Sequence, residues 1–138
     1  IFTEKDGAVY TEPFDVSKVE DPSLIIYAAL RTLDNKLIVT NGDQTDTIYD
    51  MMDKQCTFEQ ALRTREFEPD APNFTPRISA VLYPDGSFEI SILKEKDGKC
   101  LREFFCYEDC KEGKGYFIST YIGDGSPLPS FAGDFWRQ

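Results

Sequence analysis

Short apolar runs with the two-residue alternation of β-strands fill much of this chain, and turn-forming residues separate them. The first forty residues predict two hairpins. The first lies within residues 1–10. The second joins an apolar strand over residues 24–33 to a strand over residues 37–40, through a turn at residues 34–36.

The second half of the chain carries the clearest strand pattern. Asp-Gly pairs at residues 85–86 and 97–98 separate three apolar runs, and a fourth run follows a polar loop. Because Asp-Gly is a favoured hairpin turn, consecutive runs should pair as an antiparallel meander. The strands predicted here cover residues 77–83, 88–94, 100–107 and 115–121. The first of them is largely apolar at both odd and even positions, so we expect both of its faces to be covered.

Two helices are predicted between these β regions. Directly after the second hairpin the apolar period becomes helical until about Asp53, with Asp43 or Thr45 as the N-terminal cap. The predicted inner face of this helix consists of Ile48, Met51 and Met52. Thr57 and Gln60 then match the capping-box pattern, which predicts the start of a second helix.

Proline-containing stretches connect the predicted elements. Residues 13–22 begin and end with proline, and three prolines forbid a helix within residues 68–77. Both stretches are therefore predicted to be loops. The complete pattern predicts an α+β fold of antiparallel strands with the helices grouped between them, and the favoured arrangement is two packed sheets with helices outside.

Net charge and composition limit the partners of the protein. The 138 residues carry a formal charge of −10, whereas nucleic-acid binding depends on clustered lysines and arginines, so we expect no nucleic-acid partner. A phosphate-bearing ligand would need a local pocket of basic or backbone N–H groups. No apolar run reaches the roughly 20 residues that span a bilayer, and no secretory signal is visible. We therefore expect a cytoplasmic protein without a membrane partner.

Histidine is absent, which excludes Ser-His-Asp and Cys-His catalysis within this chain. The cysteines are Cys56, Cys100, Cys106 and Cys110, and they lack C-x-x-C spacing. If Cys100 and Cys106 share one strand, they lie roughly 20 Å apart and cannot pair. We expect reduced thiols, mostly small buried hydrophobes, and no zinc site. Because Asp43, Asp46 and Asp50 do not match a calcium loop, we expect no metal there.

Polar residues at strand ends are the candidates for chemistry. Residues 41–46 follow an apolar strand and form either a turn with a helix cap or an anion site at a helix N-terminus. Arg77 begins a buried strand and needs a carboxylate or a bound anion as its partner. Tyr27, in an apolar strand, either packs its ring or aims its hydroxyl at a partner. Of Glu66 and Glu68, one is a candidate general base and the other a surface charge.

Taken in chain order, these residues resemble the archaeal-type IMP cyclohydrolase family, and more closely its bacterial relatives. The resemblance spans residues 22–121, and the resemblance to the bacterial branch continues through residues 127–131. It rests on Asn-Gly-x-x-Thr-Asp at residues 41–46, Thr-Pro-Arg-Ile at residues 75–78 and Phe-Ile-Ser-Thr-Tyr at residues 117–121. It implies a four-layer αββα sandwich of antiparallel sheets like that of N-terminal nucleophile hydrolases. It also implies a homo-oligomer that needs no cofactor.

The resemblance further implies the substrate and its site. The reaction closes 5-formamidoimidazole-4-carboxamide ribonucleotide to inosine monophosphate with loss of water. Tyr27 would donate to the formyl oxygen, and Glu68 would position or deprotonate the carboxamide. Arg77 and Asn41 would hold the polar edge of the substrate. The other substrate-binding residues implied are Asp43, Thr45, Asp46 and Thr75. Compared with the family, the loop before Thr75 has an extra residue, so Glu66 is the alternative to Glu68.

The sequence also departs from the family pattern. Asp43-Gln44 stands where archaeal members have a Ser-His pair, and the chain begins just past the family's N-terminal strand region. We therefore expect residues 1–138 to form a single IMP cyclohydrolase-like domain without that region, and leave its activity open. The alternatives are a non-catalytic purine-ribonucleotide-binding domain and a small-amide hydrolase. Against the last, Ile1 is not the Cys, Ser or Thr that an N-terminal nucleophile requires.

Overall fold

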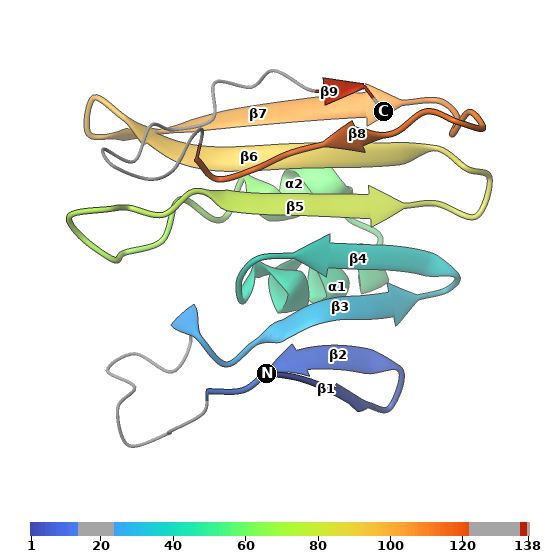
Figure 1. The fold of residues 1–138 in the computed structure, drawn as a ribbon, viewed down its shortest axis with the longest axis horizontal. Coiled ribbons are helices and arrows are strands. Elements are labelled where there is room, and N and C mark those ends of the chain that lie inside the picture. Colours follow the sequence, from blue (N-terminus) through green and yellow to red (C-terminus); the bar gives the residue numbers. More distant parts are fainter. Residues whose placement is uncertain (14–23, 122–135, 138) are drawn as a thin grey trace.

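The computed structural model describes residues 1–13, 24–121 and 136–137, which form a seven-stranded antiparallel sheet with two helices on one face (Figure 1). The strands of this sheet follow chain order: β1 (Phe2–Lys5), β2 (Ala8–Thr11), β3 (Ala28–Leu33), β4 (Lys36–Thr40), β5 (Arg77–Leu82), β6 (Phe88–Lys96) and β7 (Lys99–Tyr107). The helices, α1 (Gln44–Asp53) and α2 (Phe58–Leu62), lie between β4 and β5 in the chain. A short pair, β8 (Tyr116–Phe117) with β9 (Trp136–Arg137), completes the described structure.

The α+β prediction and the grouping of the helices are therefore confirmed. The four-layer sandwich is not, because the only further sheet among the described residues is the two-residue pairing of β8 with β9. Most of the predicted loop at residues 13–22, and the family motif at residues 127–131, lie outside the described residues. No helix in the described ranges is both long and apolar enough to cross a membrane.

Turn chemistry accounts for the strand connections. Asp34 and Asn35 both have positive φ, 48° and 66°, as a mirror-image turn between two twisted strands requires. The turns before β6 and β7 contain Gly86 and Gly98, also at positive φ. The predicted hairpins and the meander from β5 to β7 are confirmed.

Local signals also place the two helices. Thr57 caps α2, because its hydroxyl accepts from the Gln60 N–H while the Gln60 side chain accepts from the Thr57 N–H. The predicted capping box is therefore confirmed. Asp43 occupies the N-cap position of α1, but its carboxylate makes no capping hydrogen bond. The inner face of α1 is as predicted, with Ile48 fully buried and the two methionines packed against the core.

The core lies between the helices and one face of the sheet. Its buried residues are Leu33, Ile38, Ile48, Phe58, Ala61, Leu62, Val81 and Leu93. On β5, Arg77, Ser79 and Val81 face this side and are buried. Leu82, on the other face, is 39% exposed. The expectation that both faces of this strand are covered is thus wrong within the described structure, because the helices pack on one side only.

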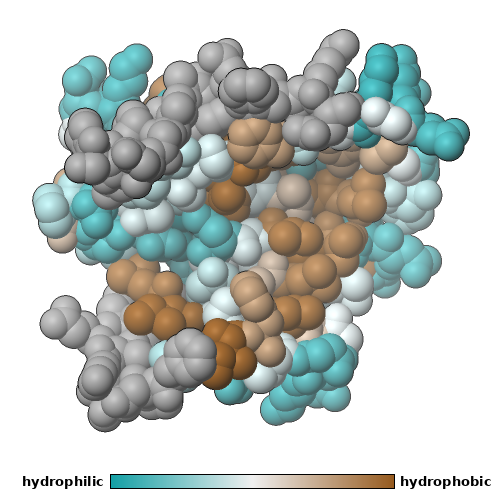
Figure 2. Space-filling view, viewed as in Figure 1, coloured by the Kyte–Doolittle hydropathy of each residue, from teal (hydrophilic) through white to brown (hydrophobic). Residues whose placement is uncertain are grey.

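The sheet face opposite the helices is rich in apolar side chains (Figure 2). Val39 and Leu82 are exposed on it, while rings of Phe88, Tyr107 and Tyr116 pack together where β8 crosses β6 and β7. Described elements therefore cover only part of this face.

Two predicted strands are much shorter in the structure, and two cysteines differ from prediction in their burial. The strand predicted from residue 24 begins at Ala28, and the strand predicted at residues 115–121 is reduced to β8. All four cysteines are free thiols. Cys56 and Cys100 are half-buried, but Cys106 and Cys110 are exposed, so the prediction of buried cysteines is wrong for the latter two.

Candidate functional site

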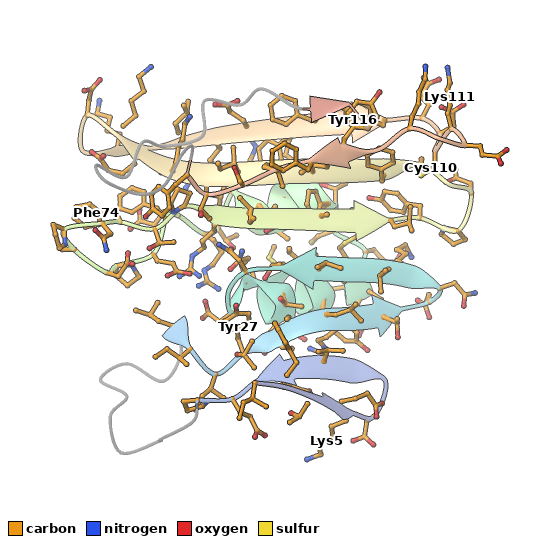
Figure 3. All side chains as sticks on the ribbon, in the orientation of Figure 1. Lys5, Tyr27, Phe74, Cys110, Lys111 and Tyr116 are labelled. Carbon is orange, nitrogen blue, oxygen red and sulfur yellow. The ribbon has the colours of Figure 1, made fainter. Side chains whose placement is uncertain are left out.

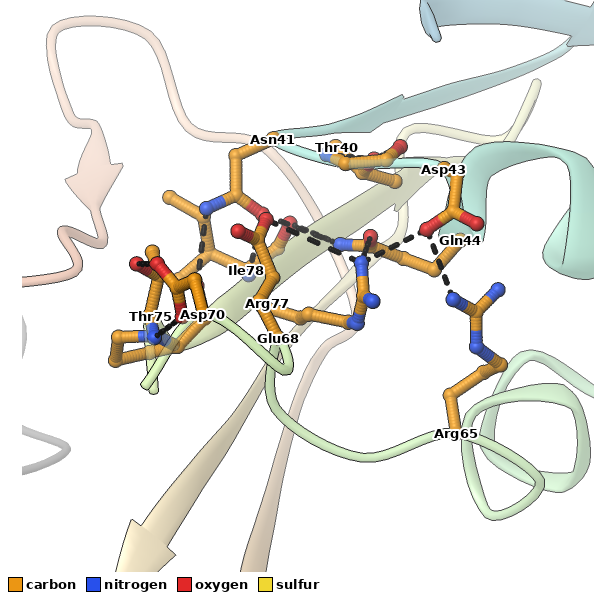
Figure 4. Close-up of polar contacts among 12 residues, drawn as sticks. Thr40, Asn41, Asp43, Gln44, Arg65, Glu68, Asp70, Thr75, Arg77 and Ile78 are labelled. Atoms are coloured by element: carbon orange, nitrogen blue, oxygen red, sulfur yellow. Dashed lines mark hydrogen bonds and ion pairs between the residues drawn. The ribbon is translucent and has the colours of Figure 1, made fainter. Parts of the chain in front are cut away.

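The candidate residues gather at one edge of the sheet. Since β3, β4 and β5 are antiparallel neighbours, the start of β3, the end of β4 and the start of β5 lie at the same edge (Figures 1 and 3). The loop after α2 crosses the same region. We use the name polar cluster for the side chains that meet there (Figure 4): Asn41, Asp43, Gln44, Arg65, Glu68 and Arg77.

Arg77 lies at the centre of the polar cluster and is only 5% exposed. Its Nη1 donates to Asp43 Oδ1 at 2.9 Å and to Gln44 Oε1 at 3.1 Å. Its Nε donates to the Glu66 carbonyl at 2.8 Å. Burial and the nearby Arg65 lower the pKa of Arg77, and Asp43 and Glu68 raise it. Asp43 is thus the carboxylate partner that a buried arginine requires.

Asp43 joins a second arginine to the polar cluster. Its Oδ1 also accepts from Arg65 Nη2 at 2.8 Å, so one carboxylate oxygen lies between two guanidinium groups. Arg65 is held from both sides: its Nη1 donates to Thr47 Oγ1 at 2.7 Å, and its carbonyl accepts from Arg102 Nη2 at 2.7 Å. Two arginines and one aspartate therefore form a fixed unit.

Glu68 is the buried carboxyl of the site, at 6% exposure. Its Oε1 lies 4.0 Å from Arg77 Nη1, beyond hydrogen-bond distance. Burial raises the pKa of Glu68 to about 7; Arg77 acts in the lowering direction, while Asp70 and Asp43 add to the rise. The alternative candidate, Glu66, has an exposed side chain and contributes its carbonyl to the cluster. A carboxyl that exchanges its proton near neutral pH can serve as a general base.

Tyr27 lies directly before β3, not within a strand as predicted. Its backbone N–H donates to Thr11 Oγ1 at 3.1 Å, and its carbonyl accepts from the Thr11 N–H at 2.9 Å. Burial and the negative charge of Glu68 raise the pKa of the Tyr27 phenol. The phenol therefore lies within electrostatic reach of Glu68 and stays protonated, which makes it a hydrogen-bond donor.

Asn41 and Gln44 tie the end of β4 to the start of β5. Asn41 Oδ1 accepts from the Ile78 N–H at 2.9 Å, and its Nδ2 donates to the Pro76 carbonyl at 3.0 Å. Gln44, fully buried, donates from Nε2 to Asn41 Oδ1 and Ser79 Oγ, both at 3.2 Å. These contacts fix the Gln44 amide so that its oxygen faces Arg77.

Gly42 passes through the polar cluster at a position with no room for a side chain. A Cβ there would lie 2.4 Å from Gln44 Oε1, 2.8 Å from Arg77 Nη1 and 3.3 Å from Glu68 Oε1. The glycine of the Asn-Gly sequence thus allows the backbone to approach all three groups closely.

The other predicted site residues have different surroundings. Thr45 is fully buried, and its hydroxyl bonds Thr40 and the Gly42 carbonyl. Thr75 donates to Asp70 and lies 3.5 Å from the Tyr121 hydroxyl. Asp46 pairs with Arg31 at 2.8 Å, and its side chain is 58% exposed. The structure therefore brings Asn41, Asp43, Glu68 and Arg77 together, with Tyr27 nearby, and places Asp46 in a separate ion pair.

Sequence reasoning missed two members of the polar cluster, Arg65 and Gln44. The contact of Arg65 with Asp43 spans 22 residues of sequence, so no local pattern indicates it. The sequence marks Gln44 only as a departure from the family pattern. Within the described ranges, no group of three or more Cys, Asp or Glu side chains is placed to hold a metal ion.

Comparisons with known proteins identify relatives of the chain. The IMP cyclohydrolase of Methanopyrus kandleri is 31% identical over 131 residues, which cover 91% of this chain and 62% of that protein. The IMP cyclohydrolases of Methanocaldococcus jannaschii and Methanococcus maripaludis are 25% and 28% identical, each over 84% of this chain. The chain spans 55% and 56% of their lengths, respectively. The family profile described as IMP cyclohydrolase-like protein matches residues 1–134, and the chain therefore belongs to the IMP cyclohydrolase-like family.

Proposed function

We propose that the polar cluster belongs to the active site of an IMP cyclohydrolase, which closes 5-formamidoimidazole-4-carboxamide ribonucleotide to inosine monophosphate. The observation that carries the proposal is the environment of Glu68: a buried carboxyl with a pKa of about 7, next to a buried arginine and a protonated tyrosine. Such a strongly perturbed carboxyl is typical of catalytic sites. The names of the three methanogen relatives support the same activity.

The reaction needs a donor and a base at opposite ends of the bond that forms. The carboxamide nitrogen attacks the formyl carbon, and negative charge develops on the formyl oxygen. Tyr27 donates its hydroxyl proton towards that oxygen, and Glu68 accepts a proton from the carboxamide nitrogen. The oxygen then leaves as water, with one hydrogen from the carboxamide nitrogen and one from the formamide nitrogen. Both side chains return to their starting protonation states.

The remaining residues act by positioning. Arg77 holds the polar edge of the substrate near Glu68, since its Nε and Nη1 are already fixed by protein acceptors. Asn41 fixes the start of β5, and buried Thr45 supports the turn at Gly42. Holding both arms of one molecule face to face supplies much of the rate of such a ring closure.

We also propose a four-layer αββα sandwich, in which a second sheet packs on the face opposite the helices. The apolar residues of that face, including exposed Val39 and Leu82, support this arrangement. Residues 1–138 would then contribute to one domain, because β1 to β7 share one sheet and the two helices pack on its face. As the resemblance implies, we propose a cytoplasmic homo-oligomer with a small-molecule purine ribonucleotide as its partner.

An ultraviolet assay of ring closure tests the activity. The wild-type protein should convert the formamido nucleotide to inosine monophosphate. Tyr27→Phe should lower turnover about 100-fold or more while calorimetry still detects binding of inosine monophosphate. Tyr10→Phe, on β2, serves as the matched control. Unchanged turnover in Tyr27→Phe would remove the phenol from the mechanism. Binding without turnover by the wild type would instead select a non-catalytic purine-ribonucleotide-binding domain.

A further inference from the structure

Asp43 occupies a helix-capping position without capping the helix. Aspartate at an N-cap normally accepts a hydrogen bond from the first turn, which stabilises the helix by about 1 kcal/mol. Here the carboxylate makes no such bond, and its Oδ1 accepts from Arg65 and Arg77 at 2.8 and 2.9 Å. The Asp43 carboxylate therefore binds the two arginines, and the first turn of α1 lacks its capping hydrogen bond.

The same contacts determine where the Arg77 guanidinium points. Its Nη1 carries two N–H bonds, and Asp43 Oδ1 and Gln44 Oε1 accept both, at 2.9 and 3.1 Å. Glu68 Oε1 is 4.0 Å from the same nitrogen. Among the described residues, no side chain or backbone group donates a hydrogen bond to the Glu68 carboxylate. Asp43 thus occupies the position next to Arg77 that the Glu68 carboxylate would otherwise take.

Arg65 keeps Asp43 in this position. It reaches Asp43 from the loop after α2, while Thr47 and Arg102 hold its guanidinium and its carbonyl. The positive charge of Arg65 also balances the negative charge that Asp43 places in the cluster. A lone Asp43, with its side chain 33% exposed, would be free to turn towards water.

We propose that Asp43 and Arg65 are positioning residues that direct the Arg77 guanidinium away from Glu68, so that the Glu68 carboxyl remains free to exchange a proton with the substrate. The role of this proton exchange rests on the proposed function. The arrangement itself does not, because it follows from the contacts of the free protein.

The groups around Glu68 determine how the two variants should shift its pKa. Facing Glu68 are Asp70 from its own loop, Arg77 from β5, Asp43 from the start of α1 and Tyr27 before β3. Asp43→Asn removes a neighbouring negative charge and releases Arg77 to pair with Glu68, so the pKa of Glu68 should fall by about one unit or more. Arg65→Gln frees the Asp43 side chain to turn towards water, which also releases Arg77 towards Glu68, so the pKa of Glu68 should fall in this variant too, by a smaller amount.

The test is a carboxyl-carbon NMR titration of protein labelled at glutamate, without substrate, from pH 4 to pH 9. Glu68→Gln assigns the signal. Asp46→Asn is the control: it removes one negative charge from the first turn of α1, where Asp46 pairs with Arg31. This variant should leave the midpoint of the Glu68 titration unchanged. Arg65→Lys, which restores a positive charge, should return the midpoint towards that of the wild type. Each variant is checked for an unchanged fold by its amide spectrum.

A fall of the Glu68 midpoint in both Asp43→Asn and Arg65→Gln supports the proposal. A rise in Arg65→Gln, which the loss of its positive charge alone predicts, or no fall in Asp43→Asn, would overturn it. The ring-closure assay gives a separate result: if the wild type lacks turnover but the titrations behave as expected, the proposed function fails and the positioning role stands. If both succeed, the acidic limb of the rate profile should move with the midpoint in each variant.

Discussion

Replacing Glu68 with glutamine should make the protein more stable at alkaline pH. In the unfolded chain this carboxyl loses its proton around its ordinary pKa of 4.5, whereas in the native protein burial raises the pKa to about 7. Between these values the native state binds a proton that the unfolded state has released. The free energy of unfolding therefore falls as the pH rises through this window.

The size of the effect follows from the same two values. A rise from 4.5 to about 7, at about 1.4 kcal/mol for each pKa unit, costs the native state about 3 kcal/mol above pH 7. Glutamine cannot ionise, so Glu68→Gln should escape this loss. Relative to the wild type, the variant should therefore gain about 3 kcal/mol between pH 4.5 and pH 8.

Urea unfolding followed by circular dichroism, with a reducing agent present, measures this difference at each pH. Comparing two pH values cancels any effect of the amide on packing, because that effect is present at both. Glu112→Gln, which removes an exposed carboxylate between β7 and β8, controls for net charge and should give no such gain. A stability difference between Glu68→Gln and wild type that stays constant from pH 4.5 to pH 8 would refute the argument.

Three further outcomes can be checked. Gly42→Ala places a Cβ 2.8 Å from Arg77 Nη1, so it should destabilise the protein by about 1–3 kcal/mol in urea unfolding; wild-type stability would contradict the tight approach. Thr57→Ala removes half of the capping box and should cost about 1 kcal/mol in the same assay, while an unchanged midpoint would show that the cap contributes nothing. Desolvation of its thiol and the neighbouring Glu89 carboxylate raise the pKa of Cys106 to about 11. At pH 8 mass spectrometry should therefore find Cys106 alkylated about 100-fold more slowly than a free thiol, with Glu89→Gln faster; a free-thiol rate would exclude the effect.

The predictions that succeeded depend on partners close in sequence. Asp34-Asn35 sets a turn through its own backbone angles, and Thr57 and Gln60 satisfy each other across three residues. Such signals act before any tertiary contact forms. They located the hairpins and both helices, and thereby the strand ends at which Glu68 and Arg77 meet.

The predictions fail where contacts between residues far apart in sequence determine the local structure. The apolar run before β3 predicted a strand through Tyr27, but β2 ends at Thr11, and the hydroxyl of that threonine binds the Tyr27 N–H. Arg65 joins the polar cluster across 22 residues, through a contact that no periodicity encodes. Asp43 lies at the N-cap position as predicted, but buried Arg77 competes for its carboxylate, so the side chain does not cap the helix.

The strand order of the sheet has a consequence for how the site forms during folding. Every strand from β1 to β7 pairs with its neighbour in sequence, so most long-range contacts close short loops, which favours rapid assembly. The last strand of this sheet, β7, nevertheless carries Arg102, whose guanidinium donates two hydrogen bonds to the carbonyl of Arg65. The last strand of this sheet thus fixes the carbonyl of an arginine that lies between β4 and β5 in the chain. In a nascent chain still lacking β7, that carbonyl would have neither of its two hydrogen bonds from Arg102.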